Sequence, residues 1–374
     1  MKRRKQIFFL LSWNDYRIFQ GISRYAHEAN WRMDTRHFFT NQIPRDRVFH
    51  GMIAMGHSDP AVNAFVREKA GSVPTVILGT DSPGIKAPTV VPDNRRMAQM
   101  AAQHLYELFH KEFGWFACDS SPSGEERHAA FSLRLDELGM PCTDLTGGRT
   151  PYAASATLAL LKGCRKPIGV MCRDDHDAAV LLELCQEEGL QVPEEVAVVG
   201  VGDLESLCSF STVPMNSISP NMDALGYQAA SVLDQLMQGH TVPDVTVVPP
   251  GTLIRRFSTG CLALTDPRLK QAVRMIDARF DEALTMEEVA AAAGISRRQL
   301  YLLFRQEMRG PPHRYILDVR LEQAKKRISE NVMPLHEVAQ LCGFNTYRTL
   351  NRVFQQRFGM APSKWAKALR STSL

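Results

Sequence analysis

The sequence predicts an α/β domain with buried parallel sheets, followed by a smaller all-α domain. Three observations predict it. From residue 6 to about 255, short apolar runs alternate with amphipathic segments, which is typical of parallel strands covered on both faces by helices. Beyond Asp266 the apolar spacing becomes helical and stays so. The charge divides at the same point: residues 266–374 carry 19 Lys and Arg against 11 Asp and Glu, a net +8, and residues 1–265 carry 25 against 29, a net −4.

The α/β part is long enough for two lobes of about 125 residues each. Its expected strands are the apolar runs at 7–13, 51–56, 75–80, 115–119, 167–173 and 196–203, and its expected helices lie near 16–30, 60–70, 94–111, 125–139, 152–162, 175–189 and 221–238. The opening MKRRKQIFFLLSW has the charge of a signal peptide, but its apolar run is short and no small-residue cleavage site follows. We interpret it as a first buried strand. No apolar run reaches the 18 residues of a membrane span.

The segment FSTGCLALTDP has no clear period and separates the two parts. We therefore expect domains at 1–256 and 267–374 with a linker at 257–266. The eight cysteines form no C-x-x-C pair and no Cys/His ligand spacing, so reduced thiols, a cytoplasmic protein and neither metal nor cofactor are expected.

The all-α part contains an internal repeat. EEVAAAAGISRRQLYLLF at 287–304 aligns with HEVAQLCGFNTYRTLNRVF at 336–354, at an offset of 49 residues up to the shared Gly and 50 after it. Each copy predicts a short helix, a Gly that permits a left-handed turn, an N-cap at Ser296 or Asn345, and a longer helix. This is the pattern of a helix-turn-helix motif, and two tandem copies in a basic region indicate DNA binding.

The C-terminal region from 267 to about 369 resembles the AraC-type DNA-binding domain. HEVAQLCGF and RTLNRVFQQRFGMAPSKW follow that family's pattern, with Leu350 where an aromatic residue is usual and Trp365 where Tyr is usual. The resemblance implies two recognition helices in successive major grooves, joined by a long helix at about 311–330. It implies base-facing roles for Arg298, Tyr301, Tyr347, Arg348 and Arg352, with Asn351 on the same face, and phosphate contacts for Arg297, Arg305 and Lys364.

Two alternatives stay open for this polar face. Each of these side chains taken singly also fits a solvated helix surface. The sequence does not separate base contacts from phosphate contacts among Tyr347, Arg348, Asn351 and Arg352. The polar face lies opposite the apolar stripe in both copies of the repeat, which favours the DNA-reading interpretation for the set.

The first 255 residues are similar to the LacI/GalR-type sugar-binding domain, which has the periplasmic-binding-protein fold of two lobes around a cleft. The motifs VVPDN, ERHAAF, RDDHDAAVLLELCQEEGLQVPEEVAVVGVGD and ISPNMDALGYQAASVLDQLM occur in that family's order. Together with an AraC-type domain and the early NDYRIFQGISRYA, they resemble the bacterial xylose-operon regulators. The resemblance implies sugar-hydroxyl contacts, for which carboxylates and guanidiniums are suited, from Asp93, Arg127 and Asp175. Further candidates are Asp15, Tyr16 and Arg17, which follow the first expected strand, and Asp203.

One motif departs from the LacI/GalR-type pattern. In GVGD, Gly202 stands where that family usually has its first acidic residue, and Asp203 follows one position later. This departure bears on which sugar is bound. For each of these Asp residues alone, N-capping of a helix is the competing interpretation.

The resemblance implies a sequence-specific transcription regulator, with activation expected, that responds to D-xylose or a similar sugar. Its expected partners are operator DNA, the sugar and a second copy in a homodimer, with RNA polymerase as a further candidate. An N-terminal domain that only oligomerises is one alternative. An enzyme is another, but DDHD at 174–177 points its side chains in different directions on a helix start, and no P-loop, H-E-x-x-H or G-x-S-x-G sequence is present.

Overall fold

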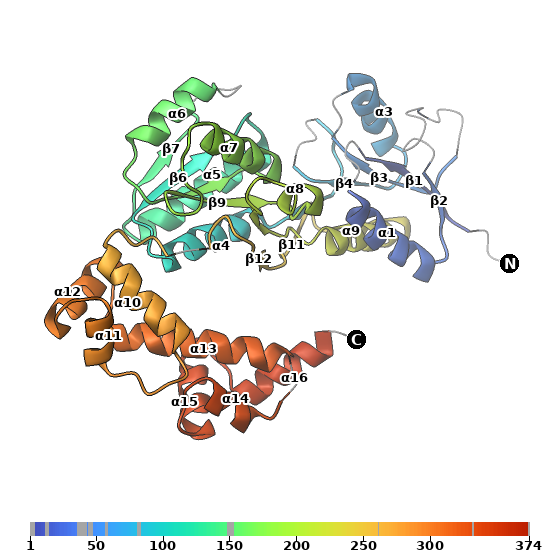
Figure 1. Cartoon of the computed structure of the whole chain (residues 1–374). Helices are drawn as coiled ribbons and strands as arrows, with labels where there is room; N and C mark the ends of the chain where they lie inside the picture. The colour runs from blue at the N-terminus through green and yellow to red at the C-terminus, as the bar shows by residue number, and fades with distance from the viewer. Residues whose placement is uncertain are drawn as a thin grey trace. The chain divides into compact units, whose positions relative to one another are not determined.

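The computed structural model describes residues 4–11, 15–35, 43, 48–56, 59–80, 84–147, 153–260, 262–330 and 333–372. The chain divides into two compact units, Met1–Leu262 and Ala263–Leu374 (Figure 1). The first contains two sheets with helices on their faces, and the second is helical. The predicted α/β domain followed by an all-α domain is therefore confirmed, while the predicted boundaries at 256 and 267 stay a prediction.

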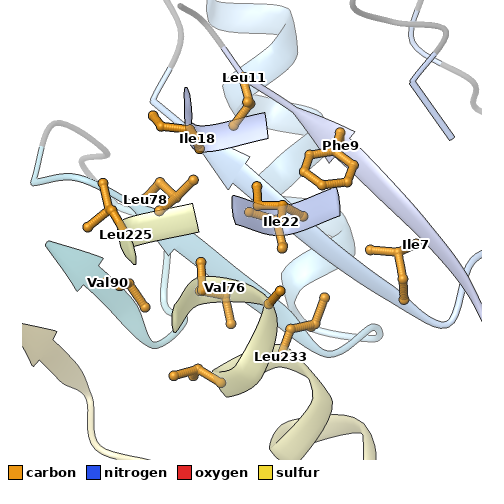
Figure 2. Packing of buried hydrophobic residues seen from close by; sticks show 14 of the residues in the cluster. Ile7, Phe9, Leu11, Ile18, Ile22, Val76, Leu78, Val90, Leu225 and Leu233 are labelled. Atoms are coloured by element: carbon orange, nitrogen blue, oxygen red, sulfur yellow. The ribbon is translucent and has the colours of Figure 1, made fainter. Parts of the chain in front are cut away.

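The first lobe is built on a parallel sheet. Its strands are β1 (Gln6–Leu10), β2 (Arg32–Asp34), β3 (Gly51–Met55), β4 (Thr75–Leu78), β5 (Thr89–Pro92) and β11 (Val245–Val248), in the order β11-β5-β4-β3-β1-β2. Successive strand residues point to opposite faces. Ile7 and Phe9 pack toward α1 (Tyr16–Glu28) and α9 (Met222–Met237), as Figure 2 shows. Phe8 packs on the other side, toward α3 (Pro60–Ala70).

The second lobe repeats this plan. Its strands are β6 (Glu112–Phe116), β7 (Cys142–Asp144), β8 (Ile168–Cys172), β9 (Val196–Val201), β10 (Asn216–Ile218) and β12 (Leu253–Ile254), in the order β12-β10-β9-β8-β6-β7. Only the β10–β12 pair is antiparallel among the described pairs of this sheet. Ala197 and Val199 face α4 (Asn94–Glu107) and α5 (Pro122–Glu137), and Val196 and Val198 face α6 (Ala154–Gly163) and α7 (Asp175–Glu187).

The expected strands and helices of the α/β part are present, with small shifts in their bounds. Strand β6 begins at Glu112, three residues before the predicted run at 115–119, because a polar residue opens a strand whose Phe113 and Trp115 are buried. Residues 12, 13 and 152 of the expected elements lie outside the described residues. The short α8 (Glu205–Cys208) and the strands β2, β5, β7, β10, β11 and β12 were not among the expected elements.

Helices α1 and α9 approach each other closely because both carry glycine at the contact. A Cβ atom on Gly21 would lie 1.9 Å from the carbonyl oxygen of Asp223, and one on Gly226 would lie 2.1 Å from that of Ile18. Both neighbours are backbone atoms, which a side-chain rotation cannot move. Glycine is therefore required at both positions for the two helices to pack at this distance.

Gly21→Ala is expected to lower the melting temperature of the protein by roughly 6–12 °C, corresponding to about 3 kcal/mol of overpacking in a domain of this size. Gly163→Ala is the matched control, because a Cβ atom there meets nothing within 4 Å. Calorimetric melting of both variants measures the difference. Equal melting temperatures for the two variants would contradict the close packing of α1 on α9.

The second unit consists of α10 (Pro267–Ala278), α11 (Met286–Ala292), α12 (Arg297–Met308), α13 (Pro312–Glu330), α14 (Leu335–Leu341), α15 (Tyr347–Phe358) and α16 (Pro362–Thr372). Helices α11 and α12 form one helix-turn-helix and α14 and α15 the other, with Gly294 (φ +65°) and Gly343 (φ +72°) in the turns. The long helix α13 was predicted at about 311–330. The predicted N-cap Ser296 is confirmed, since its side chain accepts a hydrogen bond from the backbone of Gln299.

The second predicted N-cap, Asn345, is wrong by one residue. Thr346 caps α15, and its side chain accepts a hydrogen bond from the Thr349 backbone N–H. The turn of the second copy holds one residue more than that of the first, and the extra residue moves the cap along the chain. Within the second half of the unit, Leu350 and Phe354 are buried beside Leu321 and Ala324 of α13, so the predicted apolar face of α15 packs in the core.

Candidate functional site

An ion pair between a buried carboxylate and a partly exposed guanidinium follows β1 in the chain. Asp15 is 4% exposed and caps α1 by accepting a hydrogen bond from the Arg17 backbone N–H. Its Oδ2 lies 2.7 Å from Arg17 Nη2. The same guanidinium donates to the carbonyl oxygens of Gly202 (2.8 Å) and Asp203 (3.0 Å), which follow β9 of the second lobe. Arg17 therefore ties the first lobe to the loop after β9.

A second arginine holds that loop from the other side. Arg256, which follows β12, donates to Asp203 Oδ1 (2.9 Å), Glu205 Oε2 (2.8 Å) and the carbonyl oxygen of Met215 (3.1 Å). The Asp203 carboxylate is thus already neutralised by a guanidinium. Sequence reasoning missed Arg256, and the only signal for it was a charged pair, RR, directly after an apolar run.

Asp175 lies beneath the same loop and is fully buried. Its carboxylate accepts hydrogen bonds from Ser217 Oγ (2.5 Å), the Leu204 backbone N–H (2.8 Å) and Cys208 Sγ (3.4 Å). Ser217 Oγ in turn accepts from the Asp203 N–H. One network of contacts therefore includes four of the predicted sugar-binding residues, Asp15, Arg17, Asp175 and Asp203.

The glycines after β9 explain the departure in GVGD. A Cβ atom on Gly200 would lie 2.3 Å from Asp175 Oδ1, and one on Gly202 would lie 2.9 Å from Asp175 Oδ2. Gly202 also has φ +140°, a conformation that favours glycine. An acidic residue at 202 would place its own side chain against the Asp175 carboxylate. The glycine there is a consequence of the buried acid below it.

Asp175→Asn is expected to change how the stability of the protein depends on pH. Burial raises the pKa of Asp175, partly opposed by the hydrogen bonds from Ser217 and Leu204. Because the folded-state pKa lies above the unfolded value of about 3.9, this carboxyl contributes stability that is present below pH about 3.9 and is lost as pH rises through the folded-state pKa. The melting temperature of the wild type should therefore fall, relative to that of Asp175→Asn, as pH rises from about 4. Calorimetry of both proteins across this pH range measures the difference in melting temperature. A wild-type melting temperature that rose relative to that of Asp175→Asn with increasing pH would contradict the prediction.

The remaining predicted sugar-binding residues are Arg127, Asp93 and Tyr16. Arg127 is 9% exposed and donates to Asn94 Oδ1 (2.9 Å) and to the carbonyl oxygen of Arg173 (2.6 Å). Asp93 precedes Asn94 and caps α4 through the Arg96 N–H. Tyr16 is 67% exposed at the start of α1. Asn94 of α4 forms hydrogen bonds with Glu126 and Arg127 of α5. The sequence analysis selected its neighbour Asp93 and missed Asn94.

A groove of about 170 Å³ lies between α4 and α5 and is lined by Arg95, Leu133 and Arg134, among others; its lining includes none of the predicted sugar-binding residues. In the part of the chain that the structure describes, no group of three or more His, Cys, Asp and Glu side chains is placed to hold a metal ion. Within DDHD, Asp174 caps α7, Asp175 is buried and His176 is exposed.

No helix among the described residues is long and apolar enough to cross a membrane.

The first recognition helix, α12, presents arginines on its polar side. Arg297, Arg298 and Arg305 are exposed, while Leu300 and Phe304 are buried. Arg297 pairs with Glu287 of α11 (2.8 Å) and its guanidinium lies 5.8 Å from the centre of the half-buried Tyr301 ring. Among the described residues, no acidic side chain pairs with Arg298 or Arg305.

The second recognition helix, α15, repeats this arrangement. Arg348 and Arg352 are exposed and have no acidic partner among the residues that the structure describes. Asn351 is half-buried, and the half-buried Tyr347 packs against the core of this half. Lys364 is exposed on α16. An exposed cation without an acidic partner is available to DNA phosphates and base edges.

Arg320 of α13 holds the two halves of the second unit together. It donates to the carbonyl oxygens of Phe280 (2.6 Å) and Glu282 (2.7 Å), between α10 and α11. A Cβ atom on Gly343, in the turn of the second helix-turn-helix, would lie 2.7 Å from Arg320 Nε. The side chain therefore spans the two motifs and limits how far one can rotate against the other. Its position within the long helix gave no sequence signal for this role.

The comparisons with known proteins agree with both parts of the fold. A periplasmic binding protein-like domain matches residues 102–259, and a helix-turn-helix domain matches residues 289–368. The xylose operon regulatory proteins of Haemophilus influenzae and Escherichia coli (strain K12) are 26% and 24% identical to this chain, over 94% of both chains for the first and 97% of both for the second. The chain is similar to these xylose operon regulatory proteins along nearly its whole length.

A solved structure of a xylose-binding transcription activator is similar to this chain in fold. The TM-score is 0.59 at 22% identity, with 98% of this chain and 99% of that chain covered. The two chains therefore share a fold along nearly their whole length. The resemblance to the xylose-operon regulators that the sequence indicated is confirmed.

Proposed function

We propose that this chain is a transcription regulator of sugar-catabolism genes that acts in the cytoplasm. The observation that carries the proposal is the pair of exposed arginine rows on α12 and α15, with Arg298, Arg348 and Arg352 unpaired among the described residues. Arginine bound to guanine through two hydrogen bonds is the commonest specific contact in the major groove. The relatives that match along nearly the whole chain are named as regulators of an operon, which supports a DNA-binding role over an enzymatic one.

The proposed effector is D-xylose or a similar monosaccharide, bound by the first unit. In support, Asp15 and Arg17 stand at the end of β1 and Arg17 reaches the loop after β9, so polar groups of both lobes meet at one place. Ligands of α/β folds bind at the carboxyl ends of strands. Carboxylate and guanidinium groups pair with several sugar hydroxyls at once. The names of the relatives and of the similar structure refer to xylose, which makes D-xylose the first sugar to test.

The proposed mechanism couples the two units. A sugar that contacts Arg17 and the loop after β9 favours the arrangement in which the two lobes stay joined, because a ligand shifts the population toward the state it binds more tightly. Two chains in a homodimer then present two pairs of recognition helices to two DNA half-sites. Engagement of the second half-site is intramolecular, so effective concentration supplies much of the affinity. We expect activation, with RNA polymerase as a partner.

Two experiments test the proposal on the full-length protein. Selection from a random duplex DNA library should enrich a defined sequence, and enrichment of none would overturn the DNA-binding role. A melting series with D-xylose, other pentoses and hexoses at millimolar concentration should raise the melting temperature for one sugar, since a ligand of the native state stabilises it by RT ln(1 + [L]/Kd). No response to any sugar would favour an N-terminal unit that only oligomerises.

A further inference from the structure

The first recognition helix is fastened to the segment by which the chain enters the second unit. Glu307, near the end of α12, is 8% exposed. Its Oε2 accepts a hydrogen bond from the Thr265 N–H (2.6 Å), and its Oε1 accepts from Thr265 Oγ1 (2.8 Å) and the Asp266 N–H (3.1 Å). Thr265 and Asp266 directly precede α10, and Asp266 is its N-cap. Ala263 and Leu264 before them are buried.

The chain is also fastened on the other side of the junction, within the first unit. Ser258 is fully buried, donates to the Val198 carbonyl oxygen of β9 and accepts from the Asn216 N–H of β10. Thr259 Oγ1 accepts from Asn216 Nδ2 (2.7 Å) and lies 2.8 Å from His104 Nε2 of α4. Burial and the charge of Arg255 lower the pKa of His104 to about 3, so the ring is neutral. Only residues 260–264 separate Thr259 from Thr265 in the sequence.

We infer that Glu307 is a positioning residue for DNA reading, which clamps α12 to residues 265–266 and so fixes the angle at which α12 presents Arg298. This inference rests on the proposed function, because it assigns a role within DNA recognition. A buried carboxylate that accepts three hydrogen bonds from one neighbouring segment makes helix and segment move together. Because Glu307 lies on α12, a displacement of residues 265–266 is transmitted directly to the first recognition helix.

The alternative role for Glu307 is a uniform contribution to folding, with no preference for either motif. A buried and fully bonded carboxylate in a helical domain stabilises the fold wherever it lies. The two roles differ in what the loss of the clamp does. A positioning role affects the bases that α12 reads, and a uniform role affects the whole second unit equally.

The first test measures the clamp without DNA. Hydrogen exchange in full-length Glu307→Gln should be faster by about tenfold in the peptide that covers residues 263–269, because the amide of Gln cannot replace the charged acceptor. Thr265→Val, which removes only the hydroxyl bond, should give a smaller increase in a protein that keeps Glu307. Glu322→Gln is the control, since Glu322 is exposed on α13. Unchanged exchange in both Glu307→Gln and Thr265→Val would overturn the inference.

The second test measures base preference by DNA selection with the full-length variants. The positions whose preference falls in Arg298→Ala define the half read by α12, and those that fall in Arg348→Ala define the half read by α15. Glu307→Gln and Thr265→Val should relax preference in the α12 half alone. Equal relaxation in both halves, or none, would overturn the inference. Failure of the wild type to enrich any sequence would instead overturn the proposed function.

Discussion

Replacing Arg298 and Arg348 together with alanine is expected to weaken specific DNA binding by about 2–6 kcal/mol, or between about thirtyfold and more than ten-thousandfold in Kd. Each arginine is exposed on its own recognition helix and has no acidic partner among the described residues. Each bidentate contact contributes about 1–3 kcal/mol of discrimination, and the two contacts should add because they lie on separate motifs. Fluorescence anisotropy with the selected duplex measures the change.

The control also removes two positive charges, but from arginines that form ion pairs with acidic side chains. Arg268 lies 2.6 Å from Asp266, and Arg279 lies 2.6 Å from Glu282. Arg268→Ala with Arg279→Ala should therefore weaken binding to every DNA sequence slightly and equally, through the loss of net positive charge. If Arg298→Ala with Arg348→Ala also weakened binding to selected and random DNA by the same factor, Arg298 and Arg348 would contact phosphates and would not read bases.

Replacing Arg17 with alanine is expected to lower the stability of the first unit by about 3–5 kcal/mol, because it leaves the buried Asp15 carboxylate without its partner. The side chain of Asp15 is only 1% exposed and that of Arg17 18%. The same substitution removes the bonds to Gly202 and Asp203, so any sugar that shifts the melting temperature of the wild type should lose that effect. Calorimetric melting with and without the sugar measures both consequences.

Arg24 provides the matched comparison on the same helix. It pairs with Asp223 at 2.8 Å, but both side chains are well exposed, at 51% and 40%. Arg24→Ala should cost about 0–1 kcal/mol, as exposed ion pairs do, and should keep the sugar response. The double variant Asp15→Asn with Arg17→Ala should recover part of the lost stability, since it removes the buried charge. Equal losses for Arg17→Ala and Arg24→Ala would contradict the assignment of the buried pair.

The layered fold could be predicted because its signals are local. Fully apolar runs such as the one at 196–203 identified strands buried on both faces, and the repeat at 287 and 336 identified both helix-turn-helix motifs. Short edge elements such as β2 and β12 carry too few residues to show a period. The one-residue error at Asn345 has the same origin, since Asn and Thr are both good caps and only backbone geometry distinguishes them.

The candidate site could be predicted only in part because its contacts are not local. Asp175 was expected at a strand end, but its three hydrogen-bond donors come from residues 29 to 42 positions later in the chain. Arg256 and Glu307 gave no motif, because their partners lie 41 to 53 residues away. Residue type and spacing indicate the chemistry that a side chain offers. They do not indicate which backbone groups the fold will bring to it.

A sugar bound in the first unit is expected to change how the second unit binds DNA. The Kd of the full-length protein for its selected duplex, measured with and without the sugar that raises its melting temperature, tests this coupling. We expect the Kd to change by about tenfold or more, or about 1.4 kcal/mol of coupling free energy, and we expect no change in Arg17→Ala. A Kd that stays the same while the sugar is bound would contradict it.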